Sequence, residues 1–340
     1  MKIALYVVEL FDAKLRIIFN SFNIKHKMAK VSIIGAGNVG ATCCNSIAHM
    51  NFISDMVLLD VKKGVAEGKV MDIMQTSKFH LFNTRIVGVT DDYEATADSD
   101  VVVITSGIPR KPGMTREELI GTNADIILSV VNNVLTYSPN AIIVMITNPM
   151  DTTTYLTCKR SGLARNRIIG MGGVLDSSRF HFYLSQHLNA PMLDVEGIVI
   201  GGHGDTTMIP LIKRATYNGI NVTDLLDEES QQKVVNETMV AGATLTKYLG
   251  TSAWYAPGAA AALVVKSIIL DEKRSLPCSI YLDGEYGQKD ICIGVPVIIG
   301  SSGWEKIIDL NLNIQEQELF DKSAAAIRAT NELLKEMGLV

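Results

Sequence analysis

Two glycine-rich motifs in the C-terminal half contain side chains that could perform acid and base chemistry. Asp176 and Arg179 are three residues apart in GGVLDSSRF, so both lie on one face of a predicted helix. His203 follows an apolar strand in VIGGHGD, where the flanking glycines suit a ring that projects into a cleft. A histidine exchanges protons near neutral pH. Taken singly, however, the acid and the arginine could form a surface ion pair, and the histidine could be a core residue.

Two arginines lie in a loop that suits an anionic ligand. Arg110 and Arg116 occur in SGIPRKPGMTR, which follows the predicted strand DVVVIT. Ligands of open α/β sheets bind at the carboxyl ends of the strands, and a guanidinium forms bidentate bonds with a carboxylate. A solvated basic loop is the alternative.

A third motif predicts a dinucleotide site. GAGNVG, residues 35–40, directly follows the predicted strand VSII and begins a predicted helix, which is the context that this motif requires. Gly35 would permit a tight turn, Gly37 would let the backbone approach a pyrophosphate, and Gly40 would let helix and strand pack closely. The helix N-terminus would face the phosphates.

An acid twenty residues after the last glycine predicts which dinucleotide binds. Asp60 ends the second predicted strand, where its carboxylate can accept hydrogen bonds from the ribose hydroxyls. A 2'-phosphate would meet a like charge there, so the residue favours NAD over NADP, although Lys62 and Lys63 would weaken the discrimination. An acid that only completes a turn is the alternative reading of Asp60.

The elements that would position these residues alternate short β-branched runs with longer helical patterns, which predicts a parallel, doubly wound Rossmann sheet of the α/β class. After residue 150 the pattern changes to longer helices and antiparallel-looking strands, which predicts an α+β domain. Pro296, in the second of these strands, favours an edge position. The expected strands are 31–35, 56–60, 85–89, 100–105, 141–146, 274–282 and 291–299, and the expected helices are 38–50, 64–78, 117–135, 174–188, 228–249, 257–269 and 316–337.

Three regions follow from this pattern. We expect residues 1–27 to be a dispensable N-terminal extension with Met28 as the functional start, because acids interrupt its apolar run and it is poor in the arginine and serine of transit peptides. Residues 28–150 would form the NAD-binding domain and residues 151–340 the catalytic domain. The longest apolar stretch of the C-terminal half, 253–265, is too short for a membrane span.

Charge and cysteine content limit the partners. A formal net charge of -5 gives no electrostatic reason to expect nucleic acid or an anionic membrane as a partner. The five cysteines are scattered, and none has metal-ligand spacing to a histidine. We therefore expect no metal, reduced thiols and a cytoplasmic location.

Six motifs, in order along most of the chain, resemble the lactate/malate dehydrogenase family, specifically its bacterial-type malate dehydrogenases: GAGNVG, VLLD, TSGIPRKPGMTR, ITNP, GVLDSSRF and GGHGD. The resemblance implies that His203 is the proton acceptor, Asp176 its carboxylate partner and Arg179 the clamp on the substrate's C1 carboxylate. It also implies that Arg116 closes over the substrate with its loop and that Arg110 binds the second carboxylate. The implied cofactor contacts are Gly35, Ala36, Gly37, Asn38, Val39, Gly40, Asp60, Asn123, Ile146, Thr147 and Asn148, the last of which would also contact the substrate.

The implied reaction is the reversible oxidation of (S)-malate to oxaloacetate by hydride transfer to NAD, a step of the tricarboxylic acid cycle. Arg110 discriminates against lactate, because lactate-type relatives carry a neutral, glutamine-like side chain there. Leaving a buried charge unpaired costs about 3–5 kcal/mol, so pyruvate should be a poor substrate. Ala253 supports this weakly, since lactate-type relatives have a threonine at that position.

The sequence leaves three alternatives open. The chain could be a lactate or broad 2-hydroxy-acid dehydrogenase, which would share every motif except the positive charge of Arg110. It could be a catalytically silent dinucleotide-binding protein, which the intact set of His203, Asp176 and Arg179 disfavours. It could be a metal-dependent decarboxylating enzyme, which the absence of ligand spacing disfavours. The resemblance further implies a homodimer or homotetramer.

Overall fold

The structure is a computed structural model that describes residues 27–108 and 115–340. The expected extension, residues 1–27, lies outside the described residues except for Lys27, with which strand β1 begins.

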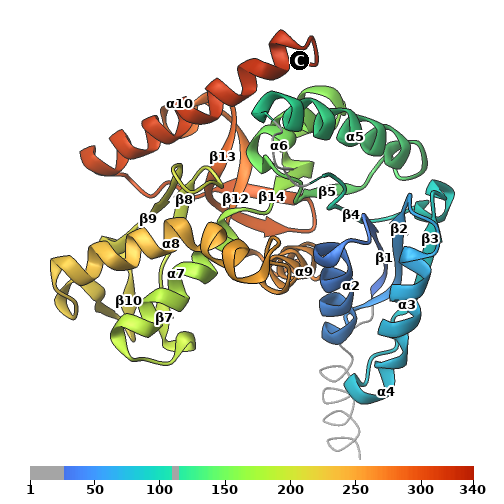
Figure 1. The fold of residues 1–340 in the computed structure, drawn as a ribbon, viewed down its shortest axis with the longest axis horizontal. Coiled ribbons are helices and arrows are strands. Elements are labelled where there is room, and N and C mark those ends of the chain that lie inside the picture. Colours follow the sequence, from blue (N-terminus) through green and yellow to red (C-terminus); the bar gives the residue numbers. More distant parts are fainter. Residues whose placement is uncertain (1–26, 109–114) are drawn as a thin grey trace, which may run out of the picture.

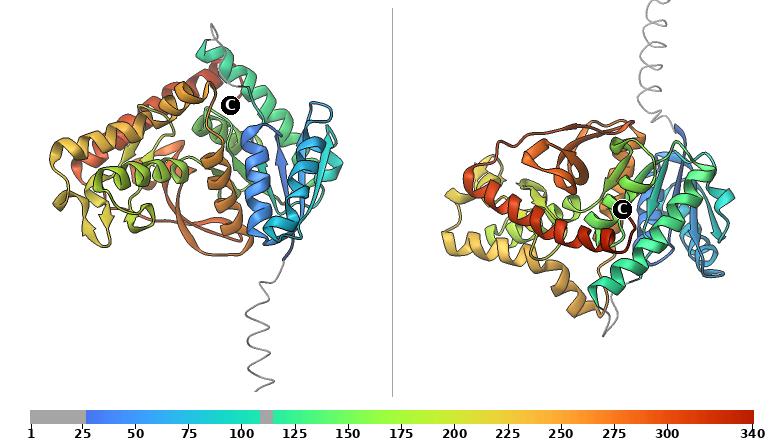
Figure 2. Two further views of the ribbon diagram at one scale, coloured as in Figure 1. Left: turned by 60° about the horizontal axis from the view of Figure 1, so that its bottom comes forward. Right: turned by 90° about the horizontal axis from the view of Figure 1, so that it is seen from above.

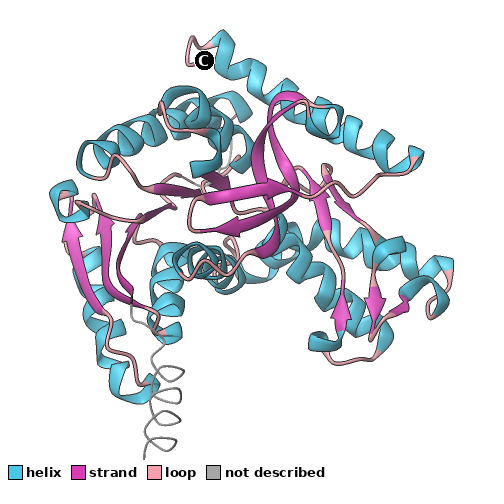
Figure 3. Cartoon of the chain, turned by 180° about the vertical axis from the view of Figure 1, so that it is seen from behind, coloured by secondary structure: helices cyan, strands magenta, loops and turns pink. Residues whose placement is uncertain are grey.

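Six parallel strands form one half of a continuous sheet, in the spatial order β3-β2-β1-β4-β5-β6. This is the doubly wound order expected from the sequence pattern, and the strands are visible from behind in Figure 3. The sheet buries both faces: in β4, Val101 and Val103 pack on one side, while Val102 and Ile104 pack on the other. The strands are β1 Lys27–Ile34, β2 Ile53–Asp60, β3 Arg85–Thr90, β4 Val101–Ile104, β5 Ile142–Met145 and β6 Ile168–Gly170.

Helices cover the two faces of the parallel strands (Figure 1). Apolar residues of α2, α3 and α9 complete the core on one face, and apolar residues of α5 complete it on the other. By length and composition, Glu117–Tyr137 of α5 is the one described helix that could cross a membrane; here its Ile127, Val130 and Val134 pack on the sheet. The helices of this part of the fold are α2 Asn38–Met50, α3 Val65–Gln75, α4 Ser77–His80, α5 Arg116–Tyr137, α6 Met150–Arg160 and α9 Tyr255–Ile269.

The sheet continues into the C-terminal half with antiparallel strands in the order β12-β13-β8-β9, and a separate small sheet has the order β11-β10-β7. Helix α7 packs on α8, and α10 crosses this half with contacts to α5 and α6 (Figure 2). The remaining elements are β7 Val195–Glu196, β8 Val199–Gly201, β9 Met208–Pro210, β10 Thr216–Tyr217, β11 Ile220–Asn221, β12 Arg274–Asp283, β13 Lys289–Gly300, β14 Gly303–Ile307, α7 Gly173–Leu188, α8 Glu228–Leu249 and α10 Ile314–Glu336.

The expectation that Pro296 marks an edge strand is wrong. Strand β13 pairs with β12 on one side and with β8 and then β14 on the other. Its partner changes between Gly294, which faces β8, and Val297, which faces β14. Pro296 lies in that interval, opposite Pro277 of β12, so its missing N–H falls where the pairing changes. The carbonyl of Pro296 still accepts a hydrogen bond from the Ile308 N–H.

Helix α6 and strand β6 are absent from the sequence expectation and carry the parallel sheet past residue 150. The first eight residues of α6 are buried, and four of them are threonines, which have low helix propensity because they are β-branched. Inside the helix, the hydroxyls of Thr154 and Thr157 donate to carbonyls four residues earlier. Tertiary burial therefore overrides the local preference. Strand β6 has only three residues, too few for a pattern.

Packing of α9 on α2 joins the two halves, and it depends on one missing side chain. A Cβ at Gly258 of α9 would lie 2.7 Å from the Thr42 Cβ and 2.8 Å from the Cys43 backbone nitrogen. We expect Gly258→Ala to lower the free energy of unfolding by about 1–3 kcal/mol through overpacking. Gly68→Ala, at an exposed position of α3, is the control, because a Cβ there meets nothing within 4 Å. Thermal unfolding should show a lower midpoint for the first variant only; equal midpoints would contradict this account of the interface.

Candidate functional site

The turn between β1 and α2 has the geometry that a dinucleotide needs. Gly35 has a φ of 106°, a conformation that glycine adopts readily. A Cβ at Gly40 would lie 1.9 Å from the Gly35 carbonyl oxygen, so only glycine permits this contact between helix and strand. Gly37 faces open space, because a Cβ there would meet nothing within 4 Å, and α2 begins at Asn38. The backbone at the helix N-terminus is therefore open to a phosphate group.

A cavity of about 620 Å³ lies at this turn, at the carboxyl ends of the parallel strands. Its lining includes Gly35, Gly37 and Asp60. The Asp60 carboxylate accepts the Ala36 N–H at 2.7 Å and the Lys62 N–H at 2.9 Å. A carboxylate has about four acceptor positions, so both oxygens can still accept ribose hydroxyls. The glycine turn and this fixed acid fit an adenine dinucleotide.

Asn123, an expected cofactor contact, is buried and bonded to the backbone. Its amide oxygen accepts the Ile108 N–H at 2.8 Å, and its nitrogen donates to the carbonyls of Ile108 and Asn148 at 3.2 and 2.8 Å. It therefore links the segment after β4 to the segment after β5. Thr147 does the same through a 2.6 Å bond to the Ser106 carbonyl. These contacts position the loops that border the cavities.

The three residues singled out for proton chemistry meet in space. The Nδ1 atom of His203 lies 2.8 Å from one Asp176 carboxylate oxygen, and the Arg179 guanidinium lies 3.2 Å from the other. Asp176 is only 1% exposed and lies in the first turn of α7, where the helix dipole favours a negative charge. The acid and the arginine share one face of α7, as their spacing predicts. The surface ion pair and the core histidine are therefore not what this structure contains.

The carboxylates around His203 govern its protonation. Burial lowers the pKa of the imidazole, but the charge of Asp176, its hydrogen bond and the charge of Asp151 raise it, while Arg179 lowers it. The result is a pKa above the ordinary value. Because Asp176 occupies Nδ1, Nε2 is the nitrogen that is left for a substrate. His203 can therefore exchange a proton with a bound molecule.

A second cavity, of about 410 Å³, brings His203 together with residues from both halves of the chain. Three expected residues line it besides the histidine and arginine: Val39 from the glycine turn, and Ile146 and Asn148 from the segment after β5. Ala253 also lines it. Sequence reasoning missed Leu119, Pro149, Met171, Leu175, Gly204, Asp205, Met208, Gly242, Thr246, Ser252 and Pro257.

Gly242 is the missed residue that the sequence signalled. It lies inside α8, where glycine is unfavourable relative to alanine, and a Cβ there would lie 3.5 Å from an Arg179 guanidinium nitrogen. The apolar members of the set carry no comparable signal, because leucine and methionine are ordinary core residues.

The two loop arginines lie before and at the start of α5. Arg110 lies outside the described residues, and Arg116 is the first residue of the helix. The helix start itself is fixed by a capping box: the Thr115 hydroxyl accepts the Glu118 N–H, and the Glu118 carboxylate accepts the Thr115 N–H. Within residues 27–108 and 115–340, no group of three or more metal-binding side chains occurs.

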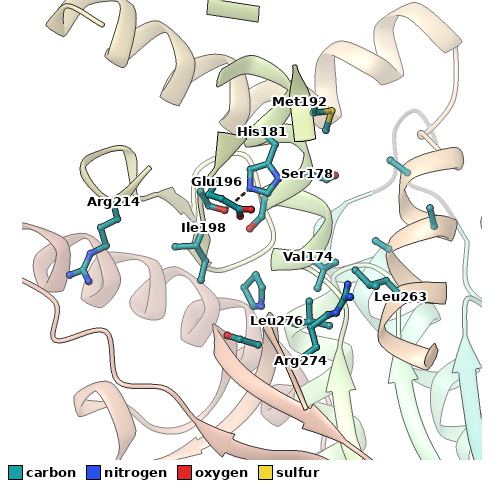
Figure 4. A pocket seen from close by; sticks show the side chains of 17 residues that line it. Val174, Ser178, His181, Met192, Glu196, Ile198, Arg214, Leu263, Arg274 and Leu276 are labelled. Carbon is teal, nitrogen blue, oxygen red and sulfur yellow. Dashed lines mark hydrogen bonds between the residues drawn. The ribbon is translucent and has the colours of Figure 1, made fainter. Parts of the chain in front are cut away.

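A larger cavity, of about 920 Å³, lies on the opposite side of α7 (Figure 4). Val174, Ser178 and His181 face it, and the His181 Nε2–H donates to the Gly197 carbonyl at 2.8 Å. Asp176 and Arg179 lie on the other face of the same helix. Size alone would therefore select a cavity whose lining lacks Asp176, Arg179 and His203.

Comparison with known proteins agrees with this geometry. Residues 29–170 match the lactate/malate dehydrogenase NAD binding domain, and residues 173–337 match the alpha/beta C-terminal domain of the same family. A malate dehydrogenase of Parabacteroides distasonis is 65% identical over 311 residues, which are 92% of this chain and 99% of the relative.

Solved structures of both enzyme types have this fold. Malate dehydrogenase from Salinibacter ruber is 40% identical with a TM-score of 0.86, covering 91% of this chain and 98% of that one. Lactate dehydrogenase from Cryptosporidium parvum, complexed with lactic acid and NAD, is 36% identical with a TM-score of 0.86 and the same coverage. The chain belongs to the lactate/malate dehydrogenase family.

Proposed function

We propose that this chain oxidises (S)-malate to oxaloacetate with NAD as hydride acceptor and catalyses the reverse reaction. The observation that carries the proposal is the contact of buried Asp176 with part-buried His203 and Arg179, beside a cavity that the dinucleotide turn also borders through Val39. The 65% identity to a malate dehydrogenase supports the dicarboxylate over a monocarboxylate substrate. The alternatives without catalysis, or with a metal, lack comparable support.

Each residue of the set would have one task. When NAD is bound, its nicotinamide accepts the hydride from C2 of malate. His203 takes the hydroxyl proton through Nε2, while Asp176 holds Nδ1 and stabilises the imidazolium. Arg179 would bind the C1 carboxylate, since a guanidinium and a carboxylate form paired hydrogen bonds. Arg116 would approach the C2 oxygen as its loop closes, and Arg110 would bind the C4 carboxylate.

We propose a homo-oligomer on the evidence of large apolar side chains that are exposed in the α3–α4 region and in α8. Met71, Phe79 and Leu81 of the α3–α4 region are 65%, 82% and 78% exposed, and Tyr248 of α8 is 79% exposed. Such side chains mark interaction surfaces when they cluster. We also propose a cytoplasmic location, because all five cysteines are free thiols, which suits a reducing compartment.

The mass in solution tests the oligomer. Light scattering should give a dimer or tetramer of the 37.0 kDa chain, and Phe79→Asp combined with Met71→Asp should shift the distribution towards the monomer, since a charge cannot be buried unpaired at low cost. A monomeric wild type would refute the proposal.

Substrate preference tests the reaction. With NADH, wild type should reduce oxaloacetate far faster than pyruvate, as followed by NADH absorbance. Arg110→Gln should reduce the kcat/KM ratio of oxaloacetate to pyruvate by roughly a hundred- to several-thousand-fold, because an unpaired buried carboxylate costs about 3–5 kcal/mol. Equal or better activity with pyruvate would favour a lactate-type enzyme, and no NADH oxidation with either acid would favour a silent binding protein.

The pH dependence tests His203. Malate oxidation needs the neutral imidazole, so kcat/KM should rise with pH through the histidine pKa; oxaloacetate reduction needs the imidazolium and should fall through the same range. Because the pKa is raised, both transitions should lie above about 6.5. His181→Asn, on the opposite face of α7, should leave the transitions in place. A transition at or below the ordinary histidine pKa would contradict the assigned environment.

Cofactor preference tests Asp60. Asp60→Asn keeps an oxygen that can accept the Ala36 N–H but removes the negative charge. We expect the kcat/KM ratio of NAD to NADP to fall roughly tenfold or more, because a like-charge contact with the 2'-phosphate is lost. Asp92→Asn, an exposed cap of the short helix Tyr93–Thr96, is the matched control. An unchanged ratio in the Asp60 variant would remove this residue from cofactor discrimination.

A further inference from the structure

A second buried carboxylate contacts the segment that carries His203. Asp151, in the first turn of α6, accepts the His203 backbone N–H at 2.7 Å through Oδ2. Its Oδ1 accepts the Ser279 hydroxyl of β12 at 2.6 Å. The residue therefore links three elements that are distant in the sequence: α6, β12 and the loop after β8.

We propose that Asp151 is a positioning residue of the proton-transfer site, which fixes the backbone of His203 and contributes a negative charge that favours the imidazolium. The proposal deepens the proposed function and rests on it. Asp176 holds the ring of His203 from α7, and Asp151 holds its backbone from α6. The histidine is thus fixed at two points by two acids on different helices.

Geometry favours a charged Asp151. Its two hydrogen bonds have the short lengths of bonds to an ionised acceptor, and the first turn of a helix stabilises an anion. A cavity of about 110 Å³, lined by Asp151, Thr152, His203 and Thr207 among others, lies beside the carboxylate. It has room for water, which reduces the desolvation cost.

The charges around the pair oppose one another. Burial raises the pKa of Asp151, the Ser279 and His203 hydrogen bonds and the His203 charge lower it, and Asp176 raises it. The net result is a raised pKa. The charged groups that act on His203 are Asp176 and Arg179 from α7 and Asp151 from α6. Asp151 also acts on β13, where burial and the charge of Asp151 both raise the pKa of the Cys292 thiol. The proposed reaction gives Asp176 a role in proton transfer, but it gives none to Asp151.

The charge effect is tested with Asp151→Asn, which keeps an oxygen for the His203 N–H and an amide that can donate to Ser279. The histidine transition in malate oxidation should move to lower pH by about one unit. Below the wild-type transition, kcat/KM relative to its plateau should then be about tenfold higher than in wild type. Asp290→Asn is the control, because Asp290 contacts Tyr155 and Lys159 further along α6 and should not move the transition.

The positioning effect is tested with Asp151→Ala, which leaves the His203 N–H without its acceptor. We expect kcat to fall about a hundredfold, as for a small misplacement of a catalytic group, with KM changed much less. Asp151→Asn, which keeps an acceptor for that N–H, should lower kcat at its optimum much less than the alanine variant. Should the alanine variant fail to fold, the asparagine variant alone decides the charge effect.

A direct titration separates this inference from the proposed function. NMR of the enzyme with labelled histidine, assigned with His203→Gln, reports the His203 protonation without any assay. A lower midpoint in Asp151→Asn supports the inference even if wild type does not oxidise malate. An unmoved midpoint, an equal shift in Asp290→Asn, or full kcat in Asp151→Ala would overturn it.

Discussion

The site depends on one buried carboxylate that an imidazole and a guanidinium share. Asp176 is 1% exposed, and an isolated anion at that depth would be strongly unfavourable. His203 contacts one carboxylate oxygen and Arg179 contacts the other, and these contacts stabilise the buried anion. The same contacts hold the imidazole and the guanidinium in position. Removing one partner of a fully buried ion pair costs about 3–5 kcal/mol. The need of the buried carboxylate for both partners therefore fixes the geometry of the proposed base and of the proposed substrate clamp together.

The sheet brings this charged set to the cofactor. All the parallel strands end at the edge where the glycine turn, Asp60 and the segment after β5 lie, and the antiparallel strands continue the same sheet under α7. The close contact of α9 with α2 at Gly258 joins the two halves. Because the cavity takes Val39 from one half and His203 from the other, the distance between the glycine turn and the histidine depends on that packing.

Helix α7 separates two environments. One face carries the shared carboxylate and its arginine, and the other borders a larger cavity around His181 (Figure 4). Helical spacing explains the division: residues 174, 178 and 181 lie on one side, and residues 175 and 179 on the other. The charged and titratable side chains therefore indicate the smaller cavity as the candidate site, although the cavity around His181 is larger.

Much of the cofactor half could be predicted from the sequence. The glycine spacing and the acid at the end of the second strand are local patterns, and the apolar run in β4 reflects a strand buried on both faces. The spacing of Asp176 and Arg179 likewise placed both on one helical face. These features depend on neighbours within a few residues, so the local sequence determines them.

Only the tertiary structure decided the rest. Asp151 is 52 residues from His203 and 128 from Ser279, and no local pattern distinguishes it from an ordinary acid in a first helical turn. Helix α6 forms from threonines that favour other conformations because its neighbours bury it, and Pro296 sits in a central strand because β13 changes partners there. Asn123 forms hydrogen bonds with two loops that lie next to each other only in the folded chain. Each of these depends on contacts between distant segments, whose free energy outweighs local preference.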